Sequence, residues 1–285
     1  MASKLASGLL IKDTMSTKTA TMPALFLAHG SPMIAIEDDD YNRTLARLAA
    51  ELPRPRAIIV VSAHWETAAQ VRVTTAEEQR TIHDFGGFPD ALYKITYPAP
   101  GAPALAAEVL AALRANGVDA AADAQRGLDH GAWVPLRFLY PEADVPVVGV
   151  SLPVPRTADT LLAIGAALAS FRSQGVLVVG SGGLVHNLRR VVFADKYAST
   201  EDWARDFDAW VAERLASGDV SGLAAWRPNA PHARLAAPTS EHFDPALVVV
   251  GAARTGERVS TVFEGFHHGT LSMRSFAFGR MEVQS

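Results

Sequence analysis

Short apolar runs alternate with longer stretches of helical spacing along most of this chain. Four of the runs are aliphatic or β-branched, carry no charge and are flanked by Gly, Pro or Ser, as buried strands are: Ala24–Ala28, Ala57–Ser62, Val147–Val150 and Leu177–Gly180. The stretches with helical spacing are Tyr41–Leu52, Ala102–Asn116, Thr157–Ser173 and Glu201–Ala216. Strands that alternate with helices predict an α/β fold, a single domain with a mostly parallel central sheet covered by helices on both faces.

The C-terminal part of the chain continues this pattern. A buried helix and two strands, which we expect at an antiparallel edge of the sheet, are predicted at Asp244–Ala253, Val259–Phe263 and Ser272–Phe278. Two long irregular stretches, 77–101 and 226–245, are of the length that is usually functional in a compact domain. Residues 1–22 are predicted to form a flexible tail, and residues 23–285 one catalytic domain.

The composition matters mainly for what it excludes. Of the 285 residues 49% are hydrophobic and 20% charged, which is a globular balance. There is no cysteine, so a bound metal must be held by His, Asp, Glu or backbone oxygens, and the lack of thiols fits a reducing cytoplasm. A net charge of −4 gives no reason to expect nucleic acid or an anionic membrane as a partner. The apolar runs are too short to span a bilayer.

Histidine is the residue type whose placement is most informative. Three of the nine histidines follow predicted strands: His29 the first, His64 the second, and His186 the fourth. The carboxyl ends of parallel strands form the edge of the sheet where ligands bind, and neutral imidazole is the commonest metal ligand. Any one of these histidines could simply cap a strand, but three at independent strand ends favour a shared metal site.

Two further histidines are candidates for the same site. His130 stands between Asp129 and Gly131, and His242 follows Glu241 just before the predicted C-terminal helix. Glu241 and His242 could instead belong to a helix-capping cluster without a catalytic role. The remaining histidines are less constrained by their surroundings: His83, His232, His267 and His268.

The donor set indicates which metals to expect. Histidines with one carboxylate suit Zn or Fe(II) better than Mg or Ca, which prefer oxygen ligands. Two histidines, a carboxylate and open positions fit ferrous oxygen chemistry, whereas three or four histidines fit zinc more naturally. The chain has no Gly-x-Ser-x-Gly elbow, Walker loop or His-Glu-x-x-His helix. Its Gly-rich segment 180–183 could cradle a phosphate, but we expect it to shape the turn that carries His186.

Six short motifs occur in a fixed order along the chain. They are Leu-Ala-His-Gly-Ser-Pro at 27–32, Ser-Ala-His-Trp at 62–65, Asp-Phe-Gly-Gly-Phe-Pro at 84–89, Tyr-Pro-Ala-Pro-Gly at 97–101, Leu-Asp-His-Gly-Ala-Trp at 128–133 and Gly-Ser-Gly-Gly at 180–183. The series resembles the class III extradiol ring-cleavage dioxygenases, and within them the 4,5-DOPA extradiol dioxygenase branch. The resemblance extends from about residue 23 to residue 280.

The resemblance implies a non-haem Fe(II) enzyme that opens a catechol ring beside its two hydroxyl-bearing carbons. Its partners would be a small aromatic diol and O2. It implies that His29 and His64 are metal ligands, and that His186 and His242 belong to a histidine-rich metal site at which zinc is also possible. In the wider class the third ligand is a glutamate, so Glu241 competes with His242 for this role, and we expect His242.

The resemblance also implies a route for protons. His186 matches an acid–base histidine, and His130 matches a second active-site histidine that assists it. Four aromatic residues near these motifs could line a pocket for the aromatic ring or merely pack in the core: Trp65, Phe85, Phe88 and Tyr93.

Two other functions could use the same histidines. In a zinc hydrolase the metal would activate water instead of O2. A non-enzymatic binding protein could keep the fold and bind a ligand without turnover. The dioxygenase is the main prediction because the ordered motifs resemble that class.

Overall fold

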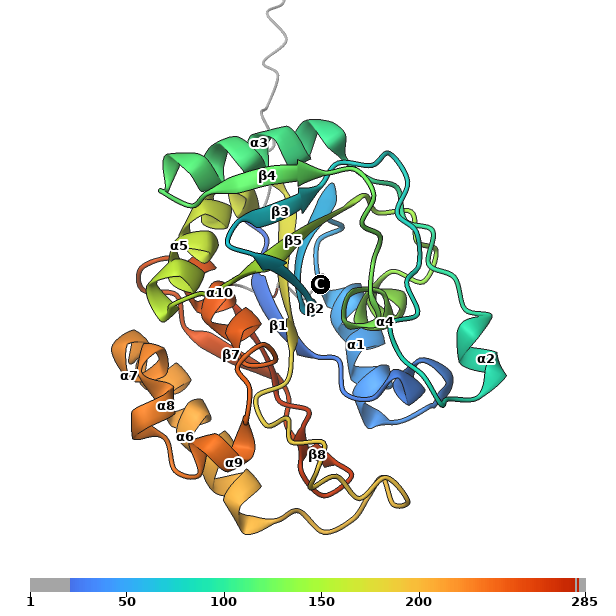
Figure 1. The fold of residues 1–285 in the computed structure, drawn as a ribbon, viewed down its shortest axis with the longest axis vertical. Coiled ribbons are helices and arrows are strands. Elements are labelled where there is room, and N and C mark those ends of the chain that lie inside the picture. Colours follow the sequence, from blue (N-terminus) through green and yellow to red (C-terminus); the bar gives the residue numbers. More distant parts are fainter. Residues whose placement is uncertain (1–20, 280, 282–285) are drawn as a thin grey trace, which may run out of the picture.

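The computed structural model describes residues 21–279 and residue 281. At its centre is an eight-stranded sheet with the strand order β4-β3-β5-β2-β6-β1-β10-β7, and β8 and β9 form a separate ribbon (Figure 1). The strands are β1 (Ala24–Ala28), β2 (Ala57–Ala68), β3 (Val71–Thr74), β4 (Ala120–Asp123), β5 (Val147–Val154), β6 (Val176–Gly182), β7 (Val259–Phe263), β8 (Phe266–His267), β9 (Leu271–Ser272) and β10 (Ser275–Phe278). The α-helices are α1 (Asp40–Glu51), α2 (Asp90–Tyr93), α3 (Pro103–Ala115), α4 (His130–Leu139), α5 (Ala158–Leu168), α6 (Asp202–Ser217), α7 (Val220–Ala224), α8 (Trp226–Asn229), α9 (Ala233–Ala236) and α10 (Asp244–Ala252). Two 3₁₀ segments are η1 (Pro32–Ile36) and η2 (Ala169–Gln174).

The four central strands run parallel. β1 pairs with β6, β6 with β2, and β2 with β5, all in parallel register. At one side β3 and β4 are parallel to each other, but β3 is antiparallel to β5. At the other side β10 and β7 continue the sheet in antiparallel pairs. The predicted single domain with a mostly parallel sheet is therefore confirmed, and so is the antiparallel C-terminal edge.

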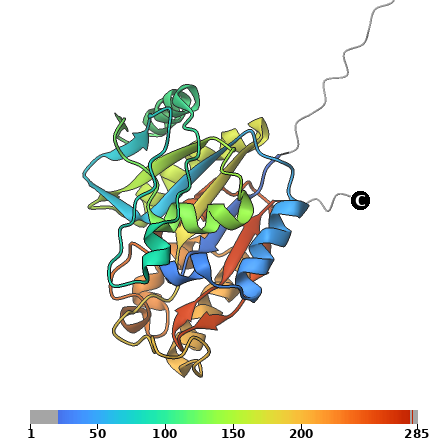
Figure 2. The same ribbon diagram turned by 90° about the vertical axis from the view of Figure 1, so that its right-hand side faces the viewer.

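The central strands are apolar on both faces because both faces are covered by helices. In β1, Leu25 and Leu27 pack in one core with side chains of α1 and α4. Ala24 and Phe26 pack in a second core with side chains of α3, α5, α10 and α6. Figure 2 shows α1 and α4 on the face turned toward the viewer. The carboxyl ends of β1 and β6 meet between these two layers.

Strand β2 departs most from its prediction. It does not end at Ser62 but continues to Ala68, and its pairing with β5 shifts between Val61 and Glu66. Such a bulge bends a strand and re-aims its side chains. His64 lies inside this bulge and not beyond the end of the strand, so the predicted placement after a strand end is corrected here.

Other boundaries differ for local reasons. Helix α4, which is not among the helices predicted above, begins at His130 because Asp129 caps it by accepting the backbone N–H of Ala132 at 3.1 Å. The long stretch 77–101 contains α2, and 226–245 contains α9. The predicted helix at 157–173 is two elements, α5 and η2. The predicted strand at 272–278 begins only at Ser275, as β10.

Most of the predicted tail, residues 1–20, lies outside the described residues. Met22, at its end, is buried, and its N–H donates to the carbonyl oxygen of Arg172 at 2.9 Å. None of the helices in the described part of the chain is long and apolar enough to cross a membrane.

Candidate metal centre and active site

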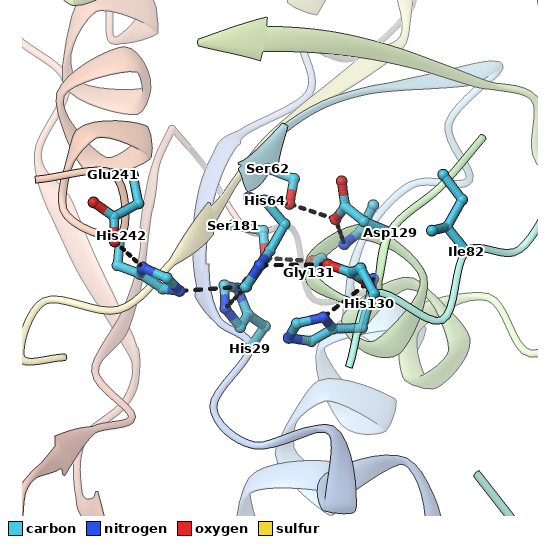
Figure 3. A network of polar contacts seen from close by, with 12 residues as sticks. His29, Ser62, His64, Ile82, Asp129, His130, Gly131, Ser181, Glu241 and His242 are labelled. Carbon is cyan, nitrogen blue, oxygen red and sulfur yellow. Dashed lines mark hydrogen bonds and ion pairs between the residues drawn. The ribbon is translucent and has the colours of Figure 1, made fainter. Parts of the chain in front are cut away.

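Three histidines from distant parts of the chain point their Nε2 atoms at one another (Figure 3). His29 follows β1, His64 lies in the bulge of β2, and His242 lies just before α10. The Nε2 atom of His64 is 3.0 Å from that of His29 and 3.3 Å from that of His242. His29 and His242 are almost fully buried, and His64 is partly buried.

Two glycines allow the backbone to approach this closely. A Cβ on Gly182 would lie 2.1 Å from the carbonyl oxygen of His242, so only glycine lets the 241–243 segment rest on the end of β6. A Cβ on Gly131 would lie 2.5 Å from Ser62 Oγ, so glycine lets the start of α4 reach His29 and His64. The glycines of these motifs thus let the segments that carry the histidines pack closely, and in the segment that ends β6 it is His242, not His186, for which Gly182 makes room.

The Nδ1 atom of each of the three imidazoles faces an oxygen. His29 Nδ1 lies 3.0 Å from Ser181 Oγ, and Ser181 Oγ itself donates to the carbonyl oxygen of Gly131. His242 Nδ1 lies 3.1 Å from a Glu241 carboxylate oxygen. His64 Nδ1 lies 3.4 Å from Asp84 Oδ2.

These oxygens fix the tautomers. A carboxylate can only accept, and Ser181 has already used its proton, so each Nδ1 carries the hydrogen. The three facing Nε2 atoms of His29, His64 and His242 therefore all present lone pairs, which leaves a gap in the hydrogen bonding that a cation would fill.

The electrostatics of the cluster favour neutral imidazoles. Burial lowers the pKa of His29 well below its usual 6.5, and the neighbouring His64 and His242 lower it further. Burial, and then the proximity of His130, lowers the pKa of His64 to about 2. For Glu241 burial alone would raise the pKa, but hydrogen bonds with His242 and Thr239 outweigh it and lower the pKa to about 2. Neutral imidazoles next to a carboxylate are the form in which such groups bind metals.

His186 lies against the outer side of His242. The two rings are stacked with centroids 3.4 Å apart and planes within 6°. The backbone N–H of His186 donates to the carbonyl oxygen of Ala236 at 2.8 Å, which holds the residue beside α9. Burial, and then His242, lowers the pKa of His186 to about 3. The ligand atoms of His186, Glu241 and His242 all lie within 4.8 Å of one another.

His130 completes the cluster from the opposite side. Its ring centroid is 4.0 Å from that of His64 and 5.3 Å from that of His29. Its partner is Asp84, whose Oδ1 accepts from the backbone N–H at 2.9 Å and from the ring Nδ1 at 3.0 Å. Asp129, the preceding residue, does not contact the His130 side chain but binds Ser62 and Arg126.

The bond from Ser62 to Asp129 is one of several that fix the β2 bulge. Ser62 Oγ donates to Asp129 Oδ1 at 2.6 Å and accepts the backbone N–H of His64 at 3.2 Å. Arg126 donates to Asp129 Oδ2 at 2.8 Å and to the carbonyl oxygen of His64 at 3.1 Å. The backbone of His64 is therefore held from both sides.

The aromatic residues separate into two groups. Phe85 lies edge-on to His130, with ring centroids 5.7 Å apart, and it also contacts Phe88 and Tyr93 at 5.4 and 5.3 Å. These three form an aromatic cluster beside the histidines. Trp65 is buried in the β2 bulge with the Arg126 guanidinium 5.5 Å from its ring, and nothing places it in that cluster.

The remaining four histidines have other partners. Nε2 of His83 is 2.9 Å from the carbonyl oxygen of Ile95, and His232 lies 3.4 Å from Asp206. His267 is buried beside Asp39 at 3.6 Å, and Nδ1 of His268 is 3.3 Å from the Val192 carbonyl oxygen.

Asp84 and Ser181 are site residues that the sequence reasoning did not single out. Both are polar residues inside the glycine-containing motifs: Ser181 stands between two glycines in Gly-Ser-Gly-Gly, and Asp84 stands two positions before a glycine in Asp-Phe-Gly-Gly. That combination was the available signal, because a polar side chain beside a glycine can approach a neighbouring segment closely.

Comparison with known proteins agrees with this geometry. Residues 23–277 match the family described as the catalytic LigB subunit of aromatic ring-opening dioxygenase. The chain is 42% identical over 275 residues to the 4,5-DOPA dioxygenase extradiol of Escherichia coli (strain K12), a match that covers 95% of this chain and 99% of the relative. It is 35% identical over 268 residues to the 4,5-DOPA dioxygenase extradiol of Beta vulgaris, covering 93% and 99% of the two chains.

A solved structure is also similar. It is the crystal structure of the uncharacterized protein JW3007 from Escherichia coli K12, with a TM-score of 0.77 and 37% identity, covering 90% of this chain and 100% of that one. The match to the family over nearly the whole folded region favours ring opening over the zinc hydrolase alternative. The chain therefore belongs to the family of the catalytic LigB subunit of aromatic ring-opening dioxygenases, and it is an extradiol ring-opening oxidoreductase with a histidine-rich candidate metal site.

Proposed function

We propose that this chain is a non-haem Fe(II) dioxygenase that opens the ring of a DOPA-like catechol with O2. In this reaction the carbon–carbon bond beside one hydroxyl-bearing carbon breaks, and both atoms of O2 enter the product. Two relatives of nearly equal length carry the name 4,5-DOPA dioxygenase extradiol, which supports a catechol with an amino-acid side chain as the substrate.

The observation that carries the proposal is the set of three facing Nε2 atoms. In the proposed site His29, His64 and His242 would hold the metal through these atoms. The Nε2 atom of His64 lies 3.0 Å from that of His29 and 3.3 Å from that of His242. His29 and His242 have Nδ1 hydrogen-bonded to an oxygen, and Nδ1 of His64 faces the Asp84 carboxylate at 3.4 Å, which is the arrangement that orients metal-binding histidines in proteins. The residues therefore fit a metal ion.

The stacking of two rings supports His242 over His186 as the third ligand. A metal lies close to the plane of each imidazole that binds it. The rings of His186 and His242 are 3.4 Å apart and nearly parallel, so one ion cannot lie in both planes. Of the two roles that the sequence predicted for His186, the proposal therefore keeps the acid–base role. In the proposal Glu241 is the carboxylate that orients His242, since its Oε1 contacts His242 Nδ1 at 3.1 Å.

An all-imidazole set suits both iron and zinc. Ferrous iron supplies the redox chemistry by which O2 and a catechol react, through coordination positions that the protein leaves open. Zn at the same site would give a folded protein that binds the catechol without consuming O2.

His130 lies beside His64 and His29, His186 lies against His242, and the two serve as the acid–base pair. The Nδ1–H of His130 is bound to Asp84, so its Nε2 lone pair is free to accept a proton from a catechol hydroxyl. The partly buried, neutral His186 beside His242 presents an imidazole that can exchange a proton with the substrate. The aromatic cluster of Phe85, Phe88 and Tyr93 beside His130 offers apolar surface to the substrate ring and limits access of water.

Anaerobic reconstitution tests the proposal. The purified protein is loaded with Fe(II), mixed with L-DOPA without oxygen, and then exposed to air. We expect a yellow ring-opened product and uptake of one O2 per substrate, and neither of these with the Zn-loaded protein or with resorcinol, whose hydroxyls are not adjacent. Fe(II)-loaded protein that consumes no O2 with L-DOPA or with simple catechols would overturn the proposal.

A further inference from the structure

Asp84 contacts two histidines of the active site with one carboxylate. Its Oδ1 accepts two hydrogen bonds from His130, from the backbone N–H at 2.9 Å and from the ring Nδ1 at 3.0 Å. Its Oδ2 lies 3.4 Å from Nδ1 of His64. The side chains are at most about a quarter exposed, at 21% for Asp84, 23% for His64 and 7% for His130. The same group thus faces a proposed metal ligand and a proposed acid–base residue.

The backbone around Asp84 is held by contacts that do not involve its side chain. The N–H of Ile82 donates to the carbonyl oxygen of Leu128, and the N–H of Leu128 donates to that of Arg80, both at 2.7 Å. The indole N–H of Trp133 donates to the carbonyl oxygen of Ile82 at 3.0 Å. The segment that carries Asp84 is therefore held against the segment that carries His130 by these bonds. The Asp84 carboxylate is not needed for that contact and can serve another purpose.

That purpose follows from the chemistry of a carboxylate. An aspartate is ionised near neutral pH and offers only acceptors, so an imidazole nitrogen that faces it carries the hydrogen. For His64 this leaves Nε2 as a lone pair directed at His29 and His242. For His130 it leaves Nε2 as a base. One carboxylate therefore selects the tautomer of both rings.

We infer that Asp84 is a positioning residue that fixes the tautomers of His64 and His130 together, and so couples metal binding to proton transfer. The inference rests on the proposed function. The competing role is purely structural, in which Asp84 only ties down the first residue of α4 by accepting its N–H.

Asp84→Asn separates the two roles. Both hydrogen bonds from His130 fall on Oδ1, so the carboxamide oxygen takes that place and keeps His130 held. The carboxamide NH₂ then takes the place of Oδ2 and faces His64 Nδ1 with a donor. His64 avoids two facing donors by moving its hydrogen to Nε2, and a protonated Nε2 cannot bind a metal.

The matched control is Asp123→Asn at the end of β4, just before the loop that leads to α4. Asp123 Oδ1 accepts the backbone N–H groups of Gln125 and Arg126, both at 2.9 Å, and it contacts no histidine. This substitution makes the same chemical change, and its carboxamide oxygen keeps both N–H groups, including that of Arg126, whose side chain holds the carbonyl oxygen of His64.

The experiment measures zinc affinity by competition with a chelator, together with the melting temperature of the metal-free protein. We expect Asp84→Asn to lose about 10–100-fold in zinc affinity, the usual effect of changing a group that orients a metal ligand. Its metal-free melting temperature should match that of Asp123→Asn, whose zinc affinity should equal that of the wild type. Asp84→Ala should show the same loss of affinity and in addition a lower kcat at saturating Fe(II), with a smaller change in KM.

Two outcomes would overturn the inference. One is an Asp84→Asn protein with wild-type zinc affinity. The other outcome needs no variant. It is a set of ¹⁵N histidine spectra of the zinc-loaded wild type that show the ring hydrogen of His130 on Nε2 instead of Nδ1. Failure of the proposed function is distinguishable, because the Fe(II)-loaded wild type would then consume no O2 with a catechol, whatever the zinc affinity of Asp84→Asn is.

Discussion

Tyr41→Phe probes how the fold holds the residue that precedes His29. The Tyr41 ring is buried, and its hydroxyl donates to the carbonyl oxygen of Ala28 and lies 3.2 Å from Ser275 Oγ. Ser275 Oγ in turn accepts the N–H of Ala28 at 3.0 Å. Both polar groups of Ala28 are therefore held by this pair, and His29 is the next residue in the chain.

The magnitude follows from these contacts. Phe keeps the ring and leaves the carbonyl oxygen of Ala28 without this donor in a buried place, which costs about 1–3 kcal/mol of the free energy of unfolding. For a domain of this size that corresponds to a melting temperature lower by roughly 2–12 °C. Because Ala28 orients His29, zinc affinity should also fall.

Tyr140→Phe is the matched control. The Tyr140 hydroxyl is buried and has no hydrogen-bond partner among the described residues. Its removal should leave the free energy of unfolding unchanged or slightly higher. Urea unfolding of both variants, followed by zinc titration, measures the difference. A Tyr41→Phe protein as stable as the wild type, or a Tyr140→Phe protein equally destabilised, would refute the reasoning.

Three further predictions concern individual histidines. His29→Ala and His64→Ala should each lose bound metal, while urea unfolding should show that the fold remains. Full metal occupancy in the purified variants would exclude these two histidines as ligands. His130→Gln should keep its metal but lower turnover by about 10²–10⁴-fold, as loss of an acid–base group does, and a fully active, metal-replete variant would exclude that role. Burial, and then Lys196, lowers the pKa of His267 to about 4, so its neutral form stabilises the fold above pH 6.5 and this stability is lost as the pH falls toward 4. At pH 5 the loss in the free energy of unfolding is about 2 kcal/mol. His267→Gln should flatten the pH profile of urea unfolding between about pH 6.5 and 4. An unchanged profile would contradict the lowered pKa of His267.

The sequence could predict the central sheet because each parallel strand carries a physical mark. Strands buried on both faces, such as Ala24–Ala28, must be apolar throughout, and this pattern is visible without any structure. The bulge in β2 has no such mark. Its polar and aromatic residues, Ser62, His64 and Trp65, break the apolar run in the way that the end of a strand does, so the prediction ended the strand at Ser62.

The candidate site divides in the same way. Histidines stand out because they follow strands or glycine turns, and His29, His64, His130, His186 and His242 do come together. Their polar partners could not be predicted, since those contacts join segments far apart in the chain. Asp84 and His130 are one example, separated by 46 positions, and His29 and Ser181 are another, separated by 152. Only the folded chain shows that the Glu241 carboxylate contacts Nδ1 of its neighbour His242.

The most direct test of the metal site is a crystal structure, or an X-ray absorption measurement, of the metal-loaded enzyme. Our account predicts that Nε2 atoms of His29, His64 and His242 bind the metal at about 2.0–2.2 Å. Glu241 should remain on Nδ1 of His242, outside bonding distance of the metal. A carboxylate oxygen of Glu241 at bonding distance, with His242 turned away, would contradict the account.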